Sequence, residues 1–123
     1  GPKHNGMPEL HQLTPTLTIL QKRGFKVALV TDGRMSGASG KVPAAIHLTP
    51  EAKDGGMIAK IRTGDLIRLD SYHGKLTVIN QEEVEAREAT YISNDDTFAF
   101  GRELFANVRK MVTKSEEGAS FLF

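Results

Sequence analysis

The sequence predicts an α+β, mainly β fold: a small β barrel or sandwich flanked by helices. Three observations favour it: a buried-type apolar run ending in a glycine-rich loop, several short apolar stretches separated by turns, and a helix-type apolar stripe near the C-terminus. With 123 residues, 39% of them hydrophobic, the chain can form one core but not two. We therefore expect a single domain over residues 1–123, divided into a lead-in loop and helix (1–24) and a barrel with a C-terminal helix (25–123).

The composition excludes several kinds of function. Sixteen basic and fifteen acidic residues nearly cancel, so the chain has no net field that favours nucleic acid or an anionic membrane. It has no cysteine, which excludes disulfides, thiol nucleophiles and thiolate-bound metal clusters within this chain. No apolar stretch approaches the roughly 20 residues of a membrane span, and no signal peptide is evident. We therefore expect a soluble, cytoplasmic domain.

The first residues predict a loop followed by helix. Residues 1–7 are rich in Gly, Pro and Asn and start without an initiator Met, as in a piece of a longer polypeptide or a tag remnant. A short helical turn is expected over 8–13. Thr14 then reads as the N-cap and Pro15 as the first residue of a helix that ends at Gly24.

The central part predicts two strands around the glycine-rich loop. The run 26–30 has no polar interruption, which is typical of a strand covered on both faces. The stretch 42–48 is apolar again and predicts a strand returning from the loop. His47 lies within it, which favours a buried histidine of the core over a catalytic one.

The middle of the chain predicts a helical turn and a hairpin. The sequence 49–52 has the cap-then-proline pattern of one helical turn, and 57–62 is apolar again. A turn at 63–65 precedes the partly alternating stretch 66–70, which the turn 72–74 separates from 75–79. This pattern predicts a β-hairpin, and three or four short strands in all.

The C-terminal part predicts helices. Residues 81–88 are charged and indicate an exposed helix, and the segment 94–96 offers N-caps for the next one. That helix would pack a stripe into the core, namely Leu104, Phe105, Val108, Met111 and Val112. The apolar end 121–123 is expected to pack on the barrel or on a partner.

The glycine-rich loop fails three motif tests. A P-loop needs Gly where Met35 stands, five positions before Gly40-Lys41. The dinucleotide fingerprint does not fit glycines at 33, 37 and 40, and neither serine of the loop has the flanking glycines of a hydrolase elbow. What remains is a nest of backbone amides flanked by Arg34 and Lys41, suited to a carboxylate or phosphate. The alternative, a tight β-connection whose glycines only allow the turn, stays open on spacing alone.

The sequence motifs of the chain resemble those of a known family. The segment from Thr31 to His47, TDGRMSGASGKVPAAIH, is similar to the C-terminal domain of the dihydroxy-acid dehydratase/6-phosphogluconate dehydratase family. The resemblance includes the stretches 1–3, 6–9, 49–52, 54–56, 64–70 and 101–105, so it covers nearly the whole chain. Met35 and the continuation 38–43 resemble the 6-phosphogluconate branch, whereas the dihydroxy-acid branch has a Gly-Gly-Thr version there.

The resemblance implies a swivelling β/β/α domain, a small barrel flanked by helices. This domain would close over an N-terminal domain that holds a 4Fe-4S cluster on cysteines, in an enzyme expected to be a homodimer. The reaction would be the dehydration of 6-phospho-D-gluconate to 2-dehydro-3-deoxy-6-phosphogluconate in the Entner–Doudoroff pathway. A dihydroxy-acid or sugar-acid substrate is the alternative. This chain alone is expected to be inactive.

The resemblance also implies roles for single residues. Ser36 would be the base, acting as an alkoxide that removes the C2 proton, and Glu9 would ligate a magnesium ion beside the cluster. Substrate contacts are expected from the loop, namely Arg34, Gly37, Ala38, Ser39 and Lys41. Arg34 could equally form an ion pair with Asp32, and Glu9 could simply favour a helix start. Lys3 and His4 are expected near Glu9 and could approach substrate.

Two other functions remain as rivals. One is a free-standing barrel that binds an anionic metabolite without chemistry. The other is an interaction domain whose 121–123 tail docks on a partner.

Overall fold

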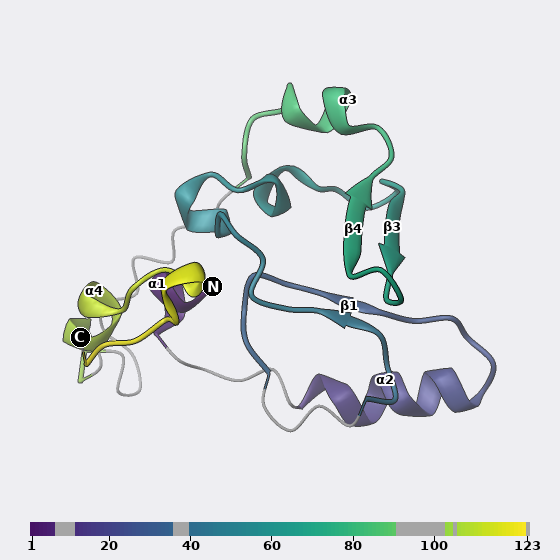
Figure 1. Ribbon diagram of the computed structural model, residues 1–123, viewed down its shortest axis with the longest axis horizontal. Helices are drawn as coiled ribbons and strands as arrows, with labels where there is room; N and C mark the ends of the chain where they lie inside the picture. The colour runs from purple at the N-terminus through teal and green to yellow at the C-terminus, as the bar shows by residue number, and fades with distance from the viewer. Residues whose placement is uncertain (7–11, 36–39, 91–102, 105, 123) are drawn as a thin grey trace.

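The computed structural model describes residues 1–6, 12–35, 40–90, 103–104 and 106–122. These residues form an α+β domain of short elements (Figure 1). In chain order the elements are α1 (Pro2–Asn5), α2 (Leu13–Lys22), β1 (Leu29–Val30), β2 (Ala44–Ala45), the 3₁₀ helices η1 (Ala52–Asp54) and η2 (Met57–Lys60), β3 (Ile67–Asp70), β4 (Lys75–Val78), α3 (Gln81–Glu85), α4 (Ala106–Met111) and the 3₁₀ helix η3 (Ser115–Glu117).

The strands of the described residues form two separate two-stranded sheets. β1 and β2 pair in parallel, with Leu29 opposite Ala44, whereas β3 and β4 are antiparallel. No closed barrel forms within the described ranges, so only the α+β class of the prediction is confirmed. In Figure 1 the β3–β4 hairpin and α3 lie on one side of β1, and α2 lies on the other.

The two strands around the loop are shorter than predicted. Of the stretch 26–30 only Leu29 and Val30 form a strand, and both are half-buried rather than covered on both faces. Of 42–48 only Ala44 and Ala45 do so. Two residues beyond β2, His47 takes a positive φ of 54°, a left-handed conformation outside the extended region. His47 is exposed, so the prediction of a buried core histidine is wrong.

The hairpin prediction is confirmed. Ile67 pairs with Val78 and Asp70 with Lys75. The turn forms because one oxygen of the Asp70 carboxylate accepts the backbone N–H groups of Tyr72 (3.1 Å) and His73 (3.0 Å). Its other oxygen lies 2.7 Å from the His73 ring, and these contacts lower the pKa of Asp70.

The N-terminal helices differ from the prediction in their starts. Residues 2–5 are helical, so the expected loop over 1–7 is wrong for this part. α2 begins at Leu13, with Thr14 inside the helix rather than at its cap. The Thr14 hydroxyl is used elsewhere, as a donor to the Met35 sulfur at 3.1 Å. The helix ends just before Gly24, which has a φ of 91°, as predicted.

The core of the described residues is small. Its buried hydrophobic residues are Ala59, Val84, Val112 and Ala119. Val84 lies in α3, which packs on η2 and β4, so this helix is not exposed all round as predicted. Arg87 fastens the end of α3 through Asp65 (2.7 Å) and Glu83 (2.6 Å).

The prediction that the C-terminal apolar stripe packs into the core is wrong in part. α4 begins only at Ala106, and Leu104 and Met111 are 76% and 64% exposed, whereas Val112 is buried. α4 packs on α1, which brings the two ends of the chain together in Figure 1. The tail does not pack on the described residues either, because Leu122 is 71% exposed. The cap candidates 94–96, together with Phe105 and Phe123, lie outside the described residues.

The helices of the described segments are all too short or too polar to cross a membrane.

The sharpest packing constraint in the fold is at Gly56, where an added Cβ would overlap the Pro50 carbonyl oxygen. Its φ of −56° suits any residue, so a loss of stability in Gly56→Ala would come from the overlap alone. We expect this variant to lose on the order of 3 kcal/mol in denaturant unfolding. Gly64→Ala is the control, because Gly64 has open space and only a positive φ, and it should lose about 1 kcal/mol. Equal losses would contradict this packing.

Candidate functional site

The start of the glycine-rich loop is held by backbone and side-chain hydrogen bonds at the end of β1. The Thr31 hydroxyl accepts the Gly33 N–H at 2.9 Å, and the Gly33 carbonyl accepts the His47 N–H at 2.9 Å. The Thr31 N–H in turn donates to the Ala45 carbonyl. The chain therefore leaves the strand in a defined direction before it reaches Met35.

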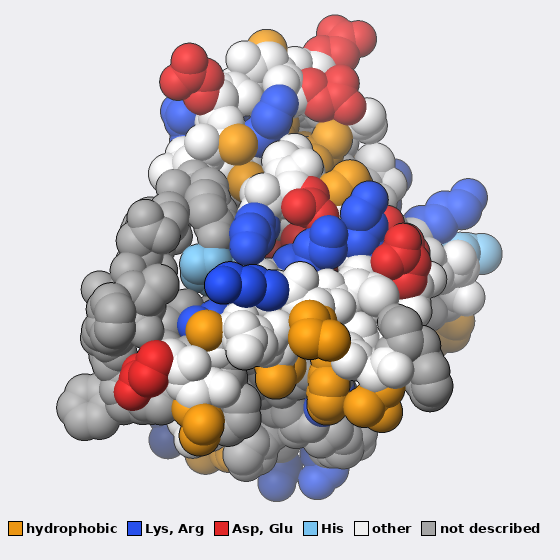
Figure 2. Space-filling model, turned by 90° about the vertical axis from the view of Figure 1, so that its left-hand side faces the viewer, with side chains coloured by type: hydrophobic (Ala, Val, Ile, Leu, Met, Phe, Trp, Pro, Cys, Tyr) orange, Lys and Arg blue, Asp and Glu red, His pale blue; other side chains and the backbone are white. Residues whose placement is uncertain are grey.

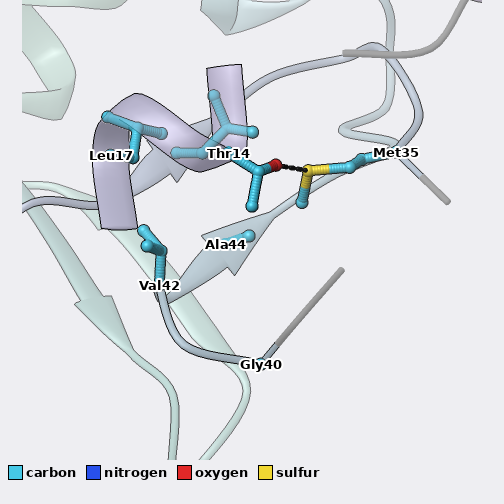
Figure 3. Close-up of a pocket in the computed structure, with 7 residues that line it drawn as sticks. Thr14, Leu17, Met35, Gly40, Val42 and Ala44 are labelled. Carbon is cyan, nitrogen blue, oxygen red and sulfur yellow. Dashed lines mark hydrogen bonds between the residues drawn. The ribbon is translucent and has the colours of Figure 1, made fainter. Parts of the chain in front are cut away.

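Both ends of the loop are attached to α2. At the start, the Met35 sulfur accepts the Thr14 hydroxyl, as the dashed line in Figure 3 shows. At the end, the Gln21 side-chain amide donates to the Lys41 carbonyl at 3.1 Å. Thr14 and Gln21 lie two turns apart on the same helix, so α2 acts as a rigid support for the loop.

The contact with α2 leaves a small apolar cavity. Met35 points into the space between α2 and the strand β2 (Figure 3). The other residues that line this cavity are Thr14, Leu17, Leu29, Gly40, Val42 and Ala44. Its volume of about 10 Å³ leaves room for one water at most. This cavity is a packing contact and not a substrate site.

A second cavity lies on the other side of the strand end. It has a volume of about 130 Å³ and is lined by α1 with its flanks, and by Thr31, Asp32, Gly33 and Arg34. Ligand pockets usually enclose about 300–1,000 Å³, so this space would hold only part of a typical ligand. It places Arg34 beside the start of the chain.

Asp32 connects three segments at this point. Its Oδ2 accepts the Ala52 N–H at 2.8 Å, and its Oδ1 lies 3.1 Å from the nitrogen of Gly1. Burial by itself would raise the pKa of Asp32. Hydrogen bonds from the Ala52 N–H and the Gly1 nitrogen oppose this effect, so the pKa lies below its ordinary value. Asp32 is therefore ionised at neutral pH.

Glu51 is the one buried charged residue of the described part of the chain, with 1% of its surface exposed. Its Oε2 accepts the Lys3 N–H at 3.1 Å, while its Oε1 has no hydrogen-bond partner among the described residues. Burial raises the pKa of Glu51, the Lys3 N–H opposes this, and the negative charges of Asp32 and Asp54 raise it further.

The sequence has clear relatives. The family "Dihydroxy-acid/6-phosphogluconate dehydratase C-terminal" matches residues 1–119. The chain belongs to this dehydratase family. Three relatives named phosphogluconate dehydratase come from Rhizobium meliloti, Pseudomonas aeruginosa and Escherichia coli. They are 56%, 58% and 53% identical to the chain over 100%, 97% and 98% of its length. The chain spans only about a fifth of these relatives, 21%, 20% and 20% of their lengths.

The structure locates only part of the predicted dehydratase site. Arg34 lines the second cavity, and Lys41 is exposed, with its carbonyl bound by Gln21. Glu9 and the loop residues Ser36, Gly37, Ala38 and Ser39 lie outside the described residues. The segments on either side of them are described, and they converge: residues 1–6 and 31–34 face the same cavity.

Sequence reasoning missed the two carboxylates that join these segments. Asp32 was considered only as a partner of Arg34, and Glu51 only as part of a helical turn. A signal was present for Asp32, because this acidic residue lies just beyond the apolar run that ends at Val30. Lys3 donates its N–H to Glu51, and its Nζ lies 3.8 Å from Asp54, so both its backbone and its side chain contact carboxylates.

The described residues contain no group of three His, Asp or Glu side chains that could hold a metal ion. The whole chain has no cysteine. A complete magnesium site therefore does not fit the described residues, and an iron–sulfur cluster on cysteines does not fit this chain.

Figure 2 shows the face on the side of α1 and α4, where Lys and Arg side chains gather around acidic ones. The charges there are mixed. Lys3 and Asp54 form an ion pair next to the second cavity, and the Lys53 ammonium donates to the Lys3 carbonyl at 3.2 Å. These contacts add to the attachment of the first residues.

The raised pKa of Glu51 predicts how stability changes with pH. The folded state binds this proton more tightly than the unfolded chain, whose glutamate titrates near 4.5. The stabilisation is thus complete below that pH and is lost as the pH rises through the folded pKa. Glu51→Gln cannot ionise, so its stability relative to the wild type should increase from about pH 4 to about pH 7 in urea denaturation. A difference that stays constant with pH would contradict a raised pKa.

Proposed function

We propose that this chain is the C-terminal domain of a dehydratase that converts 6-phospho-D-gluconate to 2-dehydro-3-deoxy-6-phosphogluconate and water. The observation that carries this is the identity of 50–58% to several phosphogluconate dehydratases, over almost the entire chain. A dihydroxy-acid dehydratase from Wolinella succinogenes is 44% identical over 80% of the chain. The greater identity and coverage favour the sugar-acid phosphate as substrate.

The proposed fold is the swivelling β/β/α domain, in which the two sheets would belong to one small barrel. The parallel β1–β2 pair and the β3–β4 hairpin would be parts of its wall. The partner is the N-terminal domain of the same polypeptide, in a homodimeric, cytoplasmic enzyme of the Entner–Doudoroff pathway.

The proposed base is Ser36, which follows directly on the anchored residue Met35. A serine hydroxyl removes the C2 proton of the substrate only as an alkoxide, so it needs donors or positive charge that lower its pKa. The amides of Gly37, Ala38 and Ser39 are the proposed donors, to the alkoxide or to the substrate carboxylate. The two attachments of the loop to α2 support this role, because a base acts efficiently only when it is held in place.

Two cations are proposed to bind the substrate anions. Arg34 lines the cavity beside α1, and Lys41 lies exposed at the end of the loop. They flank Ser36 in the sequence, which suits a substrate with a carboxylate at one end and a phosphate at the other. The Ser39 hydroxyl is a further proposed contact to the carboxylate.

The cofactors are proposed to be held mainly outside this chain. Because it has no cysteine, a 4Fe-4S cluster would be bound by the N-terminal domain. When bound, cluster iron would supply the Lewis acid for the departing C3 hydroxyl. Glu9 is proposed as one ligand of a magnesium ion, and the other ligands would be substrate, water and the N-terminal domain.

Replacement of the proposed base tests this function. In a full-length protein that contains this sequence, Ser36→Ala should lower kcat by about 10²–10⁴-fold, the usual effect of a general base, with cluster absorbance unchanged. Ser39→Ala is the matched control, because it removes a hydroxyl from the same loop. It should mainly raise KM. Turnover by Ser36→Ala near the wild-type rate would exclude Ser36 as the base.

Binding to the chain alone separates the enzyme from a free-standing binding module. Half of the proposed site is missing here, so calorimetric titration with 6-phosphogluconate should give a Kd on the order of 1 mM or weaker. Binding near 1 μM would instead favour the module that holds an anionic metabolite without chemistry.

A further inference from the structure

The buried side chain of Glu51 lies against the first residues of the chain. Its Oε2 accepts the Lys3 N–H at 3.1 Å. Gly1 also packs against it, because a Cβ added to Gly1 would overlap Oε2 of the Glu51 carboxyl group. The start of α1 therefore sits directly on this side chain, and Glu51 is 1% exposed beneath it.

The burial of this carboxyl group is unfavourable for the stability of the folded state. A carboxyl group loses its hydration when it is buried, and Oε1 has no hydrogen-bond partner among the described residues. An apolar side chain of similar size would fill the same space without an unsatisfied oxygen. An apolar side chain could not accept the Lys3 N–H, which is one of the contacts that hold the first helix.

The next residue after Glu51 extends the connection to the loop. The Ala52 N–H donates to Asp32 at 2.8 Å, and Asp32 follows β1 directly at the base of the loop. The two neighbouring residues 51 and 52 thus bind Lys3 on one side and Asp32 on the other. Through them, the segment 1–6 and the strand end 31–34 keep a constant separation.

We propose that Glu51 is a positioning residue: its buried carboxyl group fixes the lead-in segment 1–6 against the strand end that begins the loop 31–41. Glu51 acts through the Lys3 backbone and does not touch substrate. The functional consequence rests on the proposed function, in which Glu9, just beyond the lead-in segment, and Ser36 belong to one site. The structural consequence stands without it.

The variants are Glu51→Ala, Glu51→Gln and two controls, made in a full-length protein that contains this sequence. Glu51→Gln keeps a carbonyl oxygen for the Lys3 N–H, whereas Glu51→Ala removes it. Val84→Ala is the control for burial, because Val84 is 0% exposed but lies in α3. Asp54→Asn removes the exposed ion-pair partner of the Lys3 side chain and leaves the Lys3 N–H bond unchanged.

The first readout is hydrogen exchange of the peptide that covers residues 1–6, which needs no turnover. Glu51→Ala should exchange at least about tenfold faster there, while Glu51→Gln, Val84→Ala and Asp54→Asn should stay within about twofold of the wild type. Val84→Ala should instead speed exchange in α3. Unchanged exchange in Glu51→Ala, or equal loss of protection at 1–6 in Val84→Ala, would overturn the proposal.

The second readout is the split between kcat and KM. Displacing a site segment should lower kcat of Glu51→Ala by about tenfold or more, with Glu51→Gln restoring most of it and Val84→Ala near the wild-type value. A normal kcat with faster exchange at 1–6 would show that Glu51 positions the segment but that the segment does not serve the reaction. If Ser36 is not the base, the Ser36→Ala variant would keep its turnover, and this outcome is independent of the Glu51 variants.

Discussion

The arrangement of the candidate site depends on hydrogen bonds that two carboxylates accept from distant parts of the chain. Asp32, at the end of β1, accepts the Ala52 N–H, and Glu51 accepts the Lys3 N–H from within the protein. Their pKa values shift in opposite directions, because hydrogen-bond donors outweigh burial at Asp32, whereas burial dominates at Glu51.

The rest of the site is supported from the other side by α2. Thr14 and Gln21 bind the two ends of the glycine-rich loop, at Met35 and Lys41. Attachment at both ends limits how far the segment between Met35 and Lys41 can move, as the proposed role of Ser36 requires. The small described core and the several exposed large apolar side chains agree with a domain that packs against further protein.

The sequence was sufficient for the local elements with strong turn chemistry and for the family. The hairpin was predictable because Asp70 and Gly74 favour one turn, and the end of α2 because Gly24 allows a positive φ. Contacts between distant residues were not predictable. The hydroxyl of Thr14, an apparent cap, binds Met35 instead, and His47 leaves the strand in a left-handed conformation. Glu51 looked like part of a surface turn, since nothing local in the sequence shows that α1 covers it.

The most direct test of this account follows the backbone amide of Lys3 by NMR, because we propose that its hydrogen bond to Glu51 positions residues 1–6. We expect nuclear Overhauser contacts between this amide proton and the side-chain protons of Glu51. We also expect the amide shift to titrate with the Glu51 carboxyl group, above the ordinary glutamate value of 4.5. A Lys3 amide that exchanges at the rate of an unfolded peptide, shows no such contact and does not respond to pH in that range would contradict it.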